Sequence, residues 1–160
     1  MAYLIDGNNL IGHLPYLELF DPRSKRRLVA QLSIFQRAKR TKIILVFDGF
    51  PEHELGDEKF SAKKFLILYP DRGQTADTLI KEWIEKQTDS RHLYVVSSDR
   101  EIKKFARMNG AKILTCEEFN KRLKKALKKY KDSKAMKKVE TRLTPLEVDH
   151  WLEIFSESDE

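Results

Sequence analysis

The sequence predicts an α/β protein whose central sheet is mostly parallel and has about five strands. Short apolar runs suited to strands alternate with longer segments whose apolar residues recur at helical spacing. The strand candidates are 3–5, 42–47, 65–69, 93–97 and 112–114. Because helical patterns separate most of these runs, neighbouring strands should lie parallel and be joined by helical crossovers.

The first two helices have clear starting signals. Asp21-Pro22 is typical of an N-cap followed by proline at the first helical position, and the helix should continue toward Arg40. The second helix is expected over 75–88, with Thr75 as its cap. Both therefore fill gaps between strand candidates.

Two further helices complete the alternation. The spacing of Ser98 and Glu101 matches a capping box, and Asn109-Gly110 is a good C-terminal signal. Thr115, with Glu118 three positions later, predicts the start of the fourth helix. A polar loop is expected over 49–64, and a short helix over 144–155.

The composition suits one domain. With 160 residues and 41% hydrophobic content, the chain can bury a core without disulfides or structural metal. We expect residues 1–130 to form this domain, and 131–160 to form a basic connector and a terminal helix packed on it. The single cysteine, the lack of a long apolar segment and the lack of a leader pattern predict a cytoplasmic protein without membrane contact.

The charge distribution favours a polyanionic partner. The formal net charge is +6, and nine lysines and one arginine lie between Lys121 and Lys138 against a single acid, Asp132. Lysine and arginine bind phosphates with release of condensed counterions, so RNA is a natural partner. Such runs are also often simply solvated helix faces.

Four acids follow strands or begin helices. Asp6 and Asp48 follow the first and second strands, Asp77 lies in the first turn of the second helix, and Asp99 follows the fourth strand. Since parallel strands end at one edge of a sheet, these acids should converge there. Neighbouring like charges are costly, and Mg²⁺ or Mn²⁺ would offset them while activating a water for phosphodiester cleavage.

Each of these acids also has a simpler explanation. Asp77 and Asp99 suit helix starts, where a cap or dipole partner contributes roughly 0.3–1 kcal/mol. Asp6 and Asp48 each precede glycine, as turn residues do. Caps and turns do not readily explain all four together. Gly7 would allow a sharp turn after the first strand.

The motifs "LIDGNNLIG", "ILVFDG", "TADTLI" and "VVSSDREI" resemble, in order and spacing, the YacP-like branch of the NYN domains, which belong to the PIN-like nucleases. The resemblance covers nearly the whole chain. It implies a three-layer α/β/α PIN-like fold, a Mg²⁺ or Mn²⁺ site and endonucleolytic cleavage of RNA that leaves 5′-phosphate and 3′-hydroxyl ends. It also implies messenger RNA as substrate and the ribosome as a partner, as in bacterial YacP-like members.

Carried over by motif, the resemblance implies Asp6, Asp77 and Asp99 as metal ligands and Asp48 as an acid that acts through water. Asn9 matches the asparagine of the family's "DGYN" pattern and completes the predicted catalytic set. Asn8 stands where the family commonly has tyrosine, and we expect either asparagine to bond substrate phosphate or a metal-bound water.

Several basic residues are predicted to hold RNA phosphates. Arg72 and Arg100 flank the motif acids and should lie near the metal. The predicted contacts on the fourth helix are Lys121, Arg122, Lys124, Lys125, Lys128 and Lys129.

The leading hypothesis is therefore a metal-dependent endoribonuclease. A second reading is an RNA- or ribosome-binding module without intrinsic nuclease activity, whose acids are caps; it predicts tight, salt-sensitive RNA binding without Mn²⁺ binding. A third, a phosphoacceptor receiver or phosphatase on a similar sheet, gives the basic helix no purpose, and trapping of an aspartyl-phosphate would test it.

Overall fold

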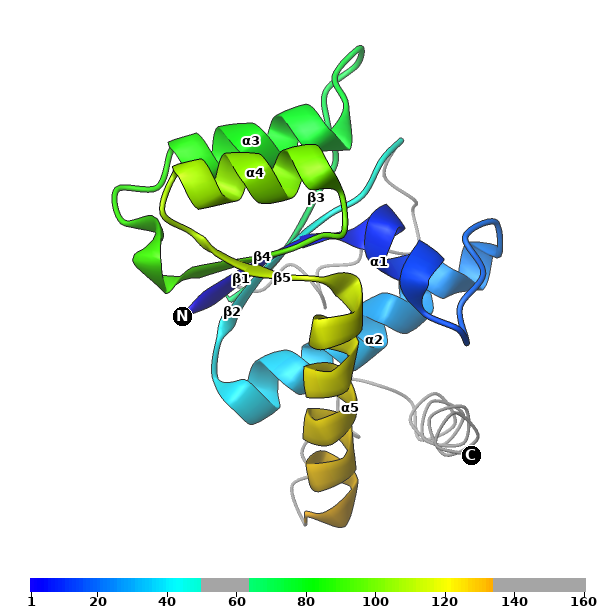
Figure 1. Ribbon diagram of the computed structural model, residues 1–160. Helices are drawn as coiled ribbons and strands as arrows, with labels where there is room; N and C mark the ends of the chain where they lie inside the picture. The colour runs from blue at the N-terminus through cyan, green and yellow to red at the C-terminus, as the bar shows by residue number, and fades with distance from the viewer. Residues whose placement is uncertain (50–63, 134–160) are drawn as a thin grey trace.

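A five-stranded, fully parallel sheet forms the centre of the computed structural model, which describes residues 1–49 and 64–133 (Figure 1). The strand order is β3-β2-β1-β4-β5. Each strand lies within one residue of its predicted range, so the predicted parallel α/β sheet is confirmed. The strands are β1 (Ala2–Asp6), β2 (Lys42–Val46), β3 (Phe65–Leu68), β4 (Leu93–Val96) and β5 (Lys112–Leu114).

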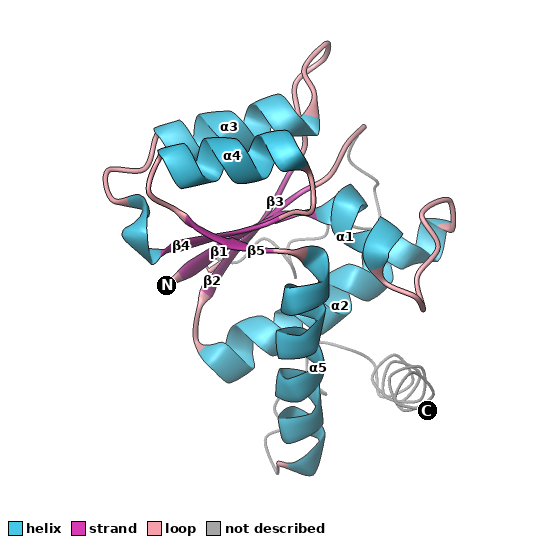
Figure 2. Cartoon of the chain, in the orientation of Figure 1, coloured by secondary structure: helices cyan, strands magenta, loops and turns pink. Residues whose placement is uncertain are grey.

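Helices cover both faces of this sheet, which confirms the three-layer arrangement (Figure 2). One face carries α1 (Gly7–His13), α2 (Pro22–Lys39) and α5 (Cys116–Asp132), and the other carries α3 (Ala76–Glu85) and α4 (Arg100–Met108). A short 3₁₀ turn, η1 (Ser90–His92), leads into β4.

The strands are apolar on both sides because each face is buried under helices. In β1, Tyr3 and Ile5 pack into the core beneath α2 and α5, whereas Leu4 packs beneath α3 and α4. Successive side chains of a strand point to opposite faces, so a strand buried on both sides needs a continuous apolar run. This requirement explains why the strands were readable as short apolar runs.

Three of the expected helix caps are confirmed. The side chains of Asp21, Thr75 and Thr115 accept hydrogen bonds from backbone N–H groups in the first turns of α2, α3 and α5. Such bonds satisfy amides that have no partner within the helix. The helix expected over 75–88 ends earlier, at Glu85.

The capping box expected at the start of α4 is wrong, whereas the simpler explanation of Asp99 as a helix cap is confirmed. Asp99, not Ser98, accepts the amides of Glu101 and Ile102, at 2.9 and 3.0 Å. The Ser98 hydroxyl instead accepts the Cys116 amide at 3.1 Å, a contact between segments distant in sequence. Spacing along the chain gives no sign of such a contact.

The helix α1 was not predicted at all. It has seven residues, no side-chain cap hydrogen bond at its N-terminus, and a sequence rich in residues typical of turns. Leu10 and Ile11 are buried against the core, and this packing holds a segment too short to be a stable helix alone.

The remaining expectations on chain organisation fall largely outside the described part of the chain. They concern the polar loop over 49–64, the connector that follows residue 131 and the helix over 144–155. Among the helices that are described, none is long and apolar enough to cross a membrane.

Candidate active site

The carboxyl ends of β1 and β4 mark the position at which an open α/β sheet is expected to bind its ligand. From β1 the chain adds β2 and β3 on one side, then β4 and β5 on the other. The change of direction between β1 and β4 is a topological switch point. In open α/β sheets, ligands bind beyond the carboxyl ends of the strands at such a point. Asp6 is the last residue of β1 and is only 6% exposed. We call this side of the sheet the carboxyl edge.

One buried hydroxyl connects two of the predicted acids. The Ser97 side chain, which is fully buried, donates to Asp6 Oδ2 at 3.3 Å. Its Oγ also accepts the Asp99 N–H at 3.1 Å. Ser97 therefore ties the carboxylate at the end of β1 to the start of α4. Sequence reasoning missed it, because the capping-box spacing drew attention to the serine that follows.

The two asparagines hold the chain on either side of Asp6. Asn8 Oδ1 accepts the Asp48 N–H at 2.9 Å, just beyond β2. Asn9 Oδ1 accepts the Ser98 N–H at 2.8 Å, just beyond β4, and the Cys116 thiol at 3.1 Å. Both amide oxygens thus fix the exits of the neighbouring strands. The predicted contacts of Asn8 and Asn9 with phosphate or water stay predictions.

Asp48 and Asp77 meet at the start of α3. Asp48 is exposed, and its Oδ1 accepts the Ala76 N–H at 3.1 Å. Asp77 is the next residue of α3 and is half-buried. Asp48 therefore caps α3 from a distant strand and lies beside the helix turn that carries Asp77.

The acids act on one another electrostatically. The pKa of Asp6 is raised to about 6, first by burial, then by the charge of Asp77 and, to a smaller extent, by that of Asp48. Hydrogen bonds from the Asn9 amide and Ser97 act in the opposite direction. The pKa of Asp77 is also raised, by burial first and then by the charges of Asp99 and Asp48. The structure thus brings the four predicted acids into one electrostatic environment, in which the ionised forms of Asp6 and Asp77 are disfavoured.

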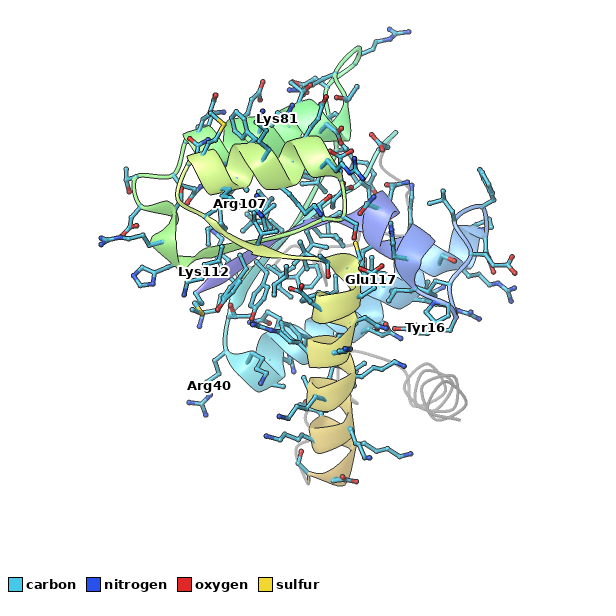
Figure 3. The ribbon with its side chains drawn as sticks, viewed as in Figure 1. Tyr16, Arg40, Lys81, Arg107, Lys112 and Glu117 are labelled. Carbon is cyan, nitrogen blue, oxygen red and sulfur yellow. The ribbon has the colours of Figure 1, made fainter. Side chains whose placement is uncertain are left out.

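Two further charged residues belong to this environment and were missed. Lys81 lies one turn after Asp77, lowers its pKa, and forms an ion pair with Glu101 at 3.7 Å. Glu101 raises the pKa of Asp77. Figure 3 shows Lys81 on the α3 and α4 layer. The i, i+4 spacing of Asp77 and Lys81 was the available signal.

Gly7 is required for space and not for a sharp turn. It is the first residue of α1 and follows Asp6 directly. A Cβ at this position would lie 2.6 Å from the Phe47 ring and 2.9 Å from the Val46 carbonyl oxygen. The expected turn is therefore replaced by a close approach of α1 to the end of β2, which only glycine permits.

The oxygen-only donors at this edge suit a hard divalent cation. In residues 1–49 and 64–133, no three His, Cys, Asp or Glu side chains converge as a ready-made metal site. Mg²⁺ is usually bound by only one or two carboxylates together with waters, and Asp77 is the acid whose charge raises the pKa of Asp6 most. A bound cation would also offset the charge that raises the pKa of both groups.

The predicted RNA contacts divide into two groups. Arg72, in the turn before α3, and Arg100, the first residue of α4, are exposed at the ends of segments that carry the acids. The others lie on α5, which carries them away from the acids. On this helix Lys121, Arg122, Lys125, Lys128 and Lys129 are exposed, and Lys124 is half-buried.

Arg122 differs from the lysines of α5 because it packs against the sheet. Its guanidinium lies 5.0 Å from the centre of the Tyr94 ring and donates to the Tyr3 hydroxyl at 3.4 Å. Such a cation over an aromatic ring is attracted by the ring's quadrupole. Arg122 therefore has a packing role that the lysines of α5 lack, and its RNA contact stays a prediction.

A three-layer parallel sheet with acids gathered at its switch point is the architecture of the PIN-like, NYN-type nuclease domains. The chain belongs to one branch of this class: it is a member of the YacP-like NYN domain family, whose sequence model matches residues 3–156. The resemblance inferred from the four motifs is thereby confirmed.

Solved structures show the same fold. The crystal structure of Rae1 (YacP) from Bacillus subtilis has a TM-score of 0.70 and 17% sequence identity, covering 99% of this chain and 92% of that one. A mutant form of the same protein has a TM-score of 0.69 and 18% identity, covering 96% and 91%. No curated protein sequence matches the chain.

Proposed function

We propose that the protein is a metal-dependent endoribonuclease that hydrolyses RNA phosphodiester bonds at the carboxyl edge of β1 and β4. The observation that carries this proposal is the state of Asp6, a buried acid at the switch point whose pKa is raised to about 6. A buried acid with a strongly raised pKa is a candidate functional residue, because its ionised form does not stabilise the fold. Membership in a nuclease-like family supports the same reading.

Asp6, Asp77 and Asp99 are the residues we propose as holders of Mg²⁺ or Mn²⁺. When bound, such an ion activates a water and neutralises charge on the phosphodiester. Asp99 uses Oδ1 to cap α4, so its contribution would come through the second oxygen of its carboxylate. Asp48 is proposed to act through water, since its Oδ1 already accepts the Ala76 amide.

The other residues of the site have positioning roles in this proposal. Ser97 orients the Asp6 carboxylate, while Asn8 and Asn9 fix the chain after β2 and β4. Such hydrogen bonds hold the acids in fixed positions, and catalysis needs reacting groups to be placed with little positional error. Arg72 and Arg100 would hold phosphates on either side of the cleaved bond.

The proposed substrate is messenger RNA in the cytoplasm, with the ribosome as a possible site of cleavage. The net charge of +6 and the lysines of α5 support an RNA partner. The ribosome is proposed because of the family resemblance described above. The test compares cleavage of RNA on translating ribosomes with cleavage of free RNA and maps the cut ends.

The test of nuclease activity compares single substitutions on purified protein. Asp6→Asn and Asp77→Asn should each abolish RNA cleavage in Mg²⁺ or Mn²⁺ while leaving the circular dichroism spectrum unchanged. Glu85→Gln is the matched control, because it removes one charge from an exposed residue at the other end of α3. Cleavage by Asp6→Asn at the parental rate would refute the assignment.

A second candidate is an RNA-binding module without nuclease activity. Two observations favour it: Asp48 and Asp99 act as helix caps, and no three ligands converge within the described residues. Titration with Mn²⁺ separates the two. Binding of Mn²⁺ that is lost in Asp77→Asn supports the nuclease, whereas tight RNA binding without any Mn²⁺ binding supports the module.

A further inference from the structure

We propose that the lysines of α5 bind a stretch of the RNA strand that is separate from the cleaved bond. The distal lysine face, as we call it, consists of Lys121, Lys124, Lys125, Lys128 and Lys129. The inference deepens the proposed function and rests on it, because it assigns to this face a part of the same substrate.

The path of α5 separates these lysines from the acids. The helix starts beside the carboxyl edge, where the Cys116 amide donates to the hydroxyl of Ser98, the residue before Asp99. From there it leads away from the sheet edge, crosses α2 and projects beyond it (Figure 1). At 1.5 Å per residue, Lys121 lies about 8 Å and Lys129 about 20 Å along the axis from Cys116.

The charge changes sign along the helix. Glu117 and Glu118 occupy the first turn, and Asp132 is the next acid of the helix. Figure 3 places Glu117 at the start of α5, and nitrogen-tipped side chains project from the helix beyond it. Positive charge therefore begins only after the helix has left the carboxyl edge.

The helix dipole does not account for most of these lysines. Cations favour a helix only within about its last turn, and the lysine face begins well before that turn. The pairs Lys121 with Lys125 and Lys125 with Lys129 have i, i+4 spacing, at which like charges destabilise a helix. In the part of the chain that the structure describes, none of the five lysines of the face forms an ion pair with an acid.

A phosphodiester backbone is the partner that best matches this surface. The opposite side of α5 is fixed by burial of Phe119, Leu123 and Leu127 in the core, so the lysines remain on the outside of a rigid rod. A row of lysines on one side of a helix suits a row of phosphates, and this helix begins beside the residues that carry the acids. RNA reaching from Asp6 to Lys129 would bind at both ends at once.

The test measures RNA affinity in the presence of a chelator, so that cleavage plays no part. The distal variant combines Lys125→Gln, Lys128→Gln and Lys129→Gln. For a long single-stranded RNA, the slope of log K against log salt should become less negative by about 2, because each phosphate contact contributes about 0.7. On the same scale the affinity at 0.1 M salt should weaken by about 100-fold.

A matched control separates the effect of where the charges lie from the effect of the total charge of the protein. The α4 variant combines Lys103→Gln, Lys104→Gln and Arg107→Gln, and so removes the same three charges from another helix. It should keep most of the parental affinity. With Mg²⁺ present, the distal variant should cleave an oligonucleotide too short to reach about 20 Å along α5 with the same kcat/KM as the α4 variant.

Equal affinity of the distal and α4 variants for long RNA would overturn the proposal and would point to an acidic protein as the partner of this face. A loss of kcat/KM for the short oligonucleotide in the distal variant, as large as its loss of affinity for long RNA, would overturn it as well, because the lysines would then contact the RNA at the cleaved bond. Failure of the parent protein to cut RNA would refute the proposed function, but the comparison of the affinities of the variants for long RNA would still be valid.

Discussion

Replacement of Asp6 by asparagine should stabilise the protein at neutral and alkaline pH while it removes activity. The pKa of Asp6 is raised from 3.8 to about 6, mainly because the carboxyl group is buried and next because Asp77 is near. At 1.36 kcal/mol for each pH unit, this rise corresponds to about 3 kcal/mol. An uncharged amide avoids this cost and can still accept the hydrogen bond from Ser97.

The sign of the effect follows from where the proton is held more tightly. Between about pH 4 and pH 6 the folded state binds a proton at Asp6 that the unfolded state has released, so stability falls as pH rises. The favourable contribution is complete below about pH 4 and is lost as pH passes through about 6. Above that, the ionised carboxylate lowers the free energy of unfolding by about 3 kcal/mol.

Urea unfolding at pH 4.5 and pH 8 measures this difference. Asp6→Asn should exceed the parent by up to about 3 kcal/mol at pH 8, and the difference should shrink toward pH 4.5. Addition of Mg²⁺ or Mn²⁺ at pH 8 should stabilise the parent and not the variant, because a ligand stabilises only a fold that binds it. Glu85→Gln controls for the loss of one negative charge.

A variant that is less stable than the parent at pH 8, measured without divalent cations, would refute the reasoning. It would mean that the hydrogen bonds accepted by the Asp6 carboxylate from Ser97 and the Asn9 amide outweigh the cost of burying its charge. The nuclease proposal would then lose the observation on which it mainly rests.

Three more predictions concern the surroundings of the acids. Gly7→Ala should destabilise the fold by about 1–3 kcal/mol in thermal unfolding, because its methyl group meets the Phe47 ring at 2.6 Å, whereas Gly12→Ala, which has open space on the same helix, should be neutral or stabilising. Asn8→Ala loses the hydrogen bond that fixes the chain after β2, so it should lower the free energy of unfolding by about 1 kcal/mol. It should also lower kcat more than it changes RNA affinity, and an unchanged kcat would contradict the positioning role of Asn8. Burial raises the pKa of Cys116 to about 11, so its thiol should react with a disulfide reagent at pH 8 only after unfolding, and rapid labelling of the native protein would count against this.

Much of the fold could be predicted from the sequence because local sequence preferences and tertiary packing favour the same elements. The strands are buried on both faces, which makes each an unbroken apolar run, and the caps Asp21, Thr75 and Thr115 act within their own helices. The short helix α1 escaped prediction because burial of Leu10 and Ile11, and not its own sequence, holds it.

The sequence by itself also determined which four acids would share one edge, since parallel strands all end on the same side and each motif acid follows a strand or starts the next helix. Only the tertiary structure decided how that edge is held together. Ser97 bonds Asp6, Asn8 and Asn9 bond the exits of β2 and β4, and Asp48 bonds the start of α3, all between residues far apart in the chain. Spacing along a sequence reports contacts within one element, and these contacts exist only because strand order places β2 and β4 on either side of β1.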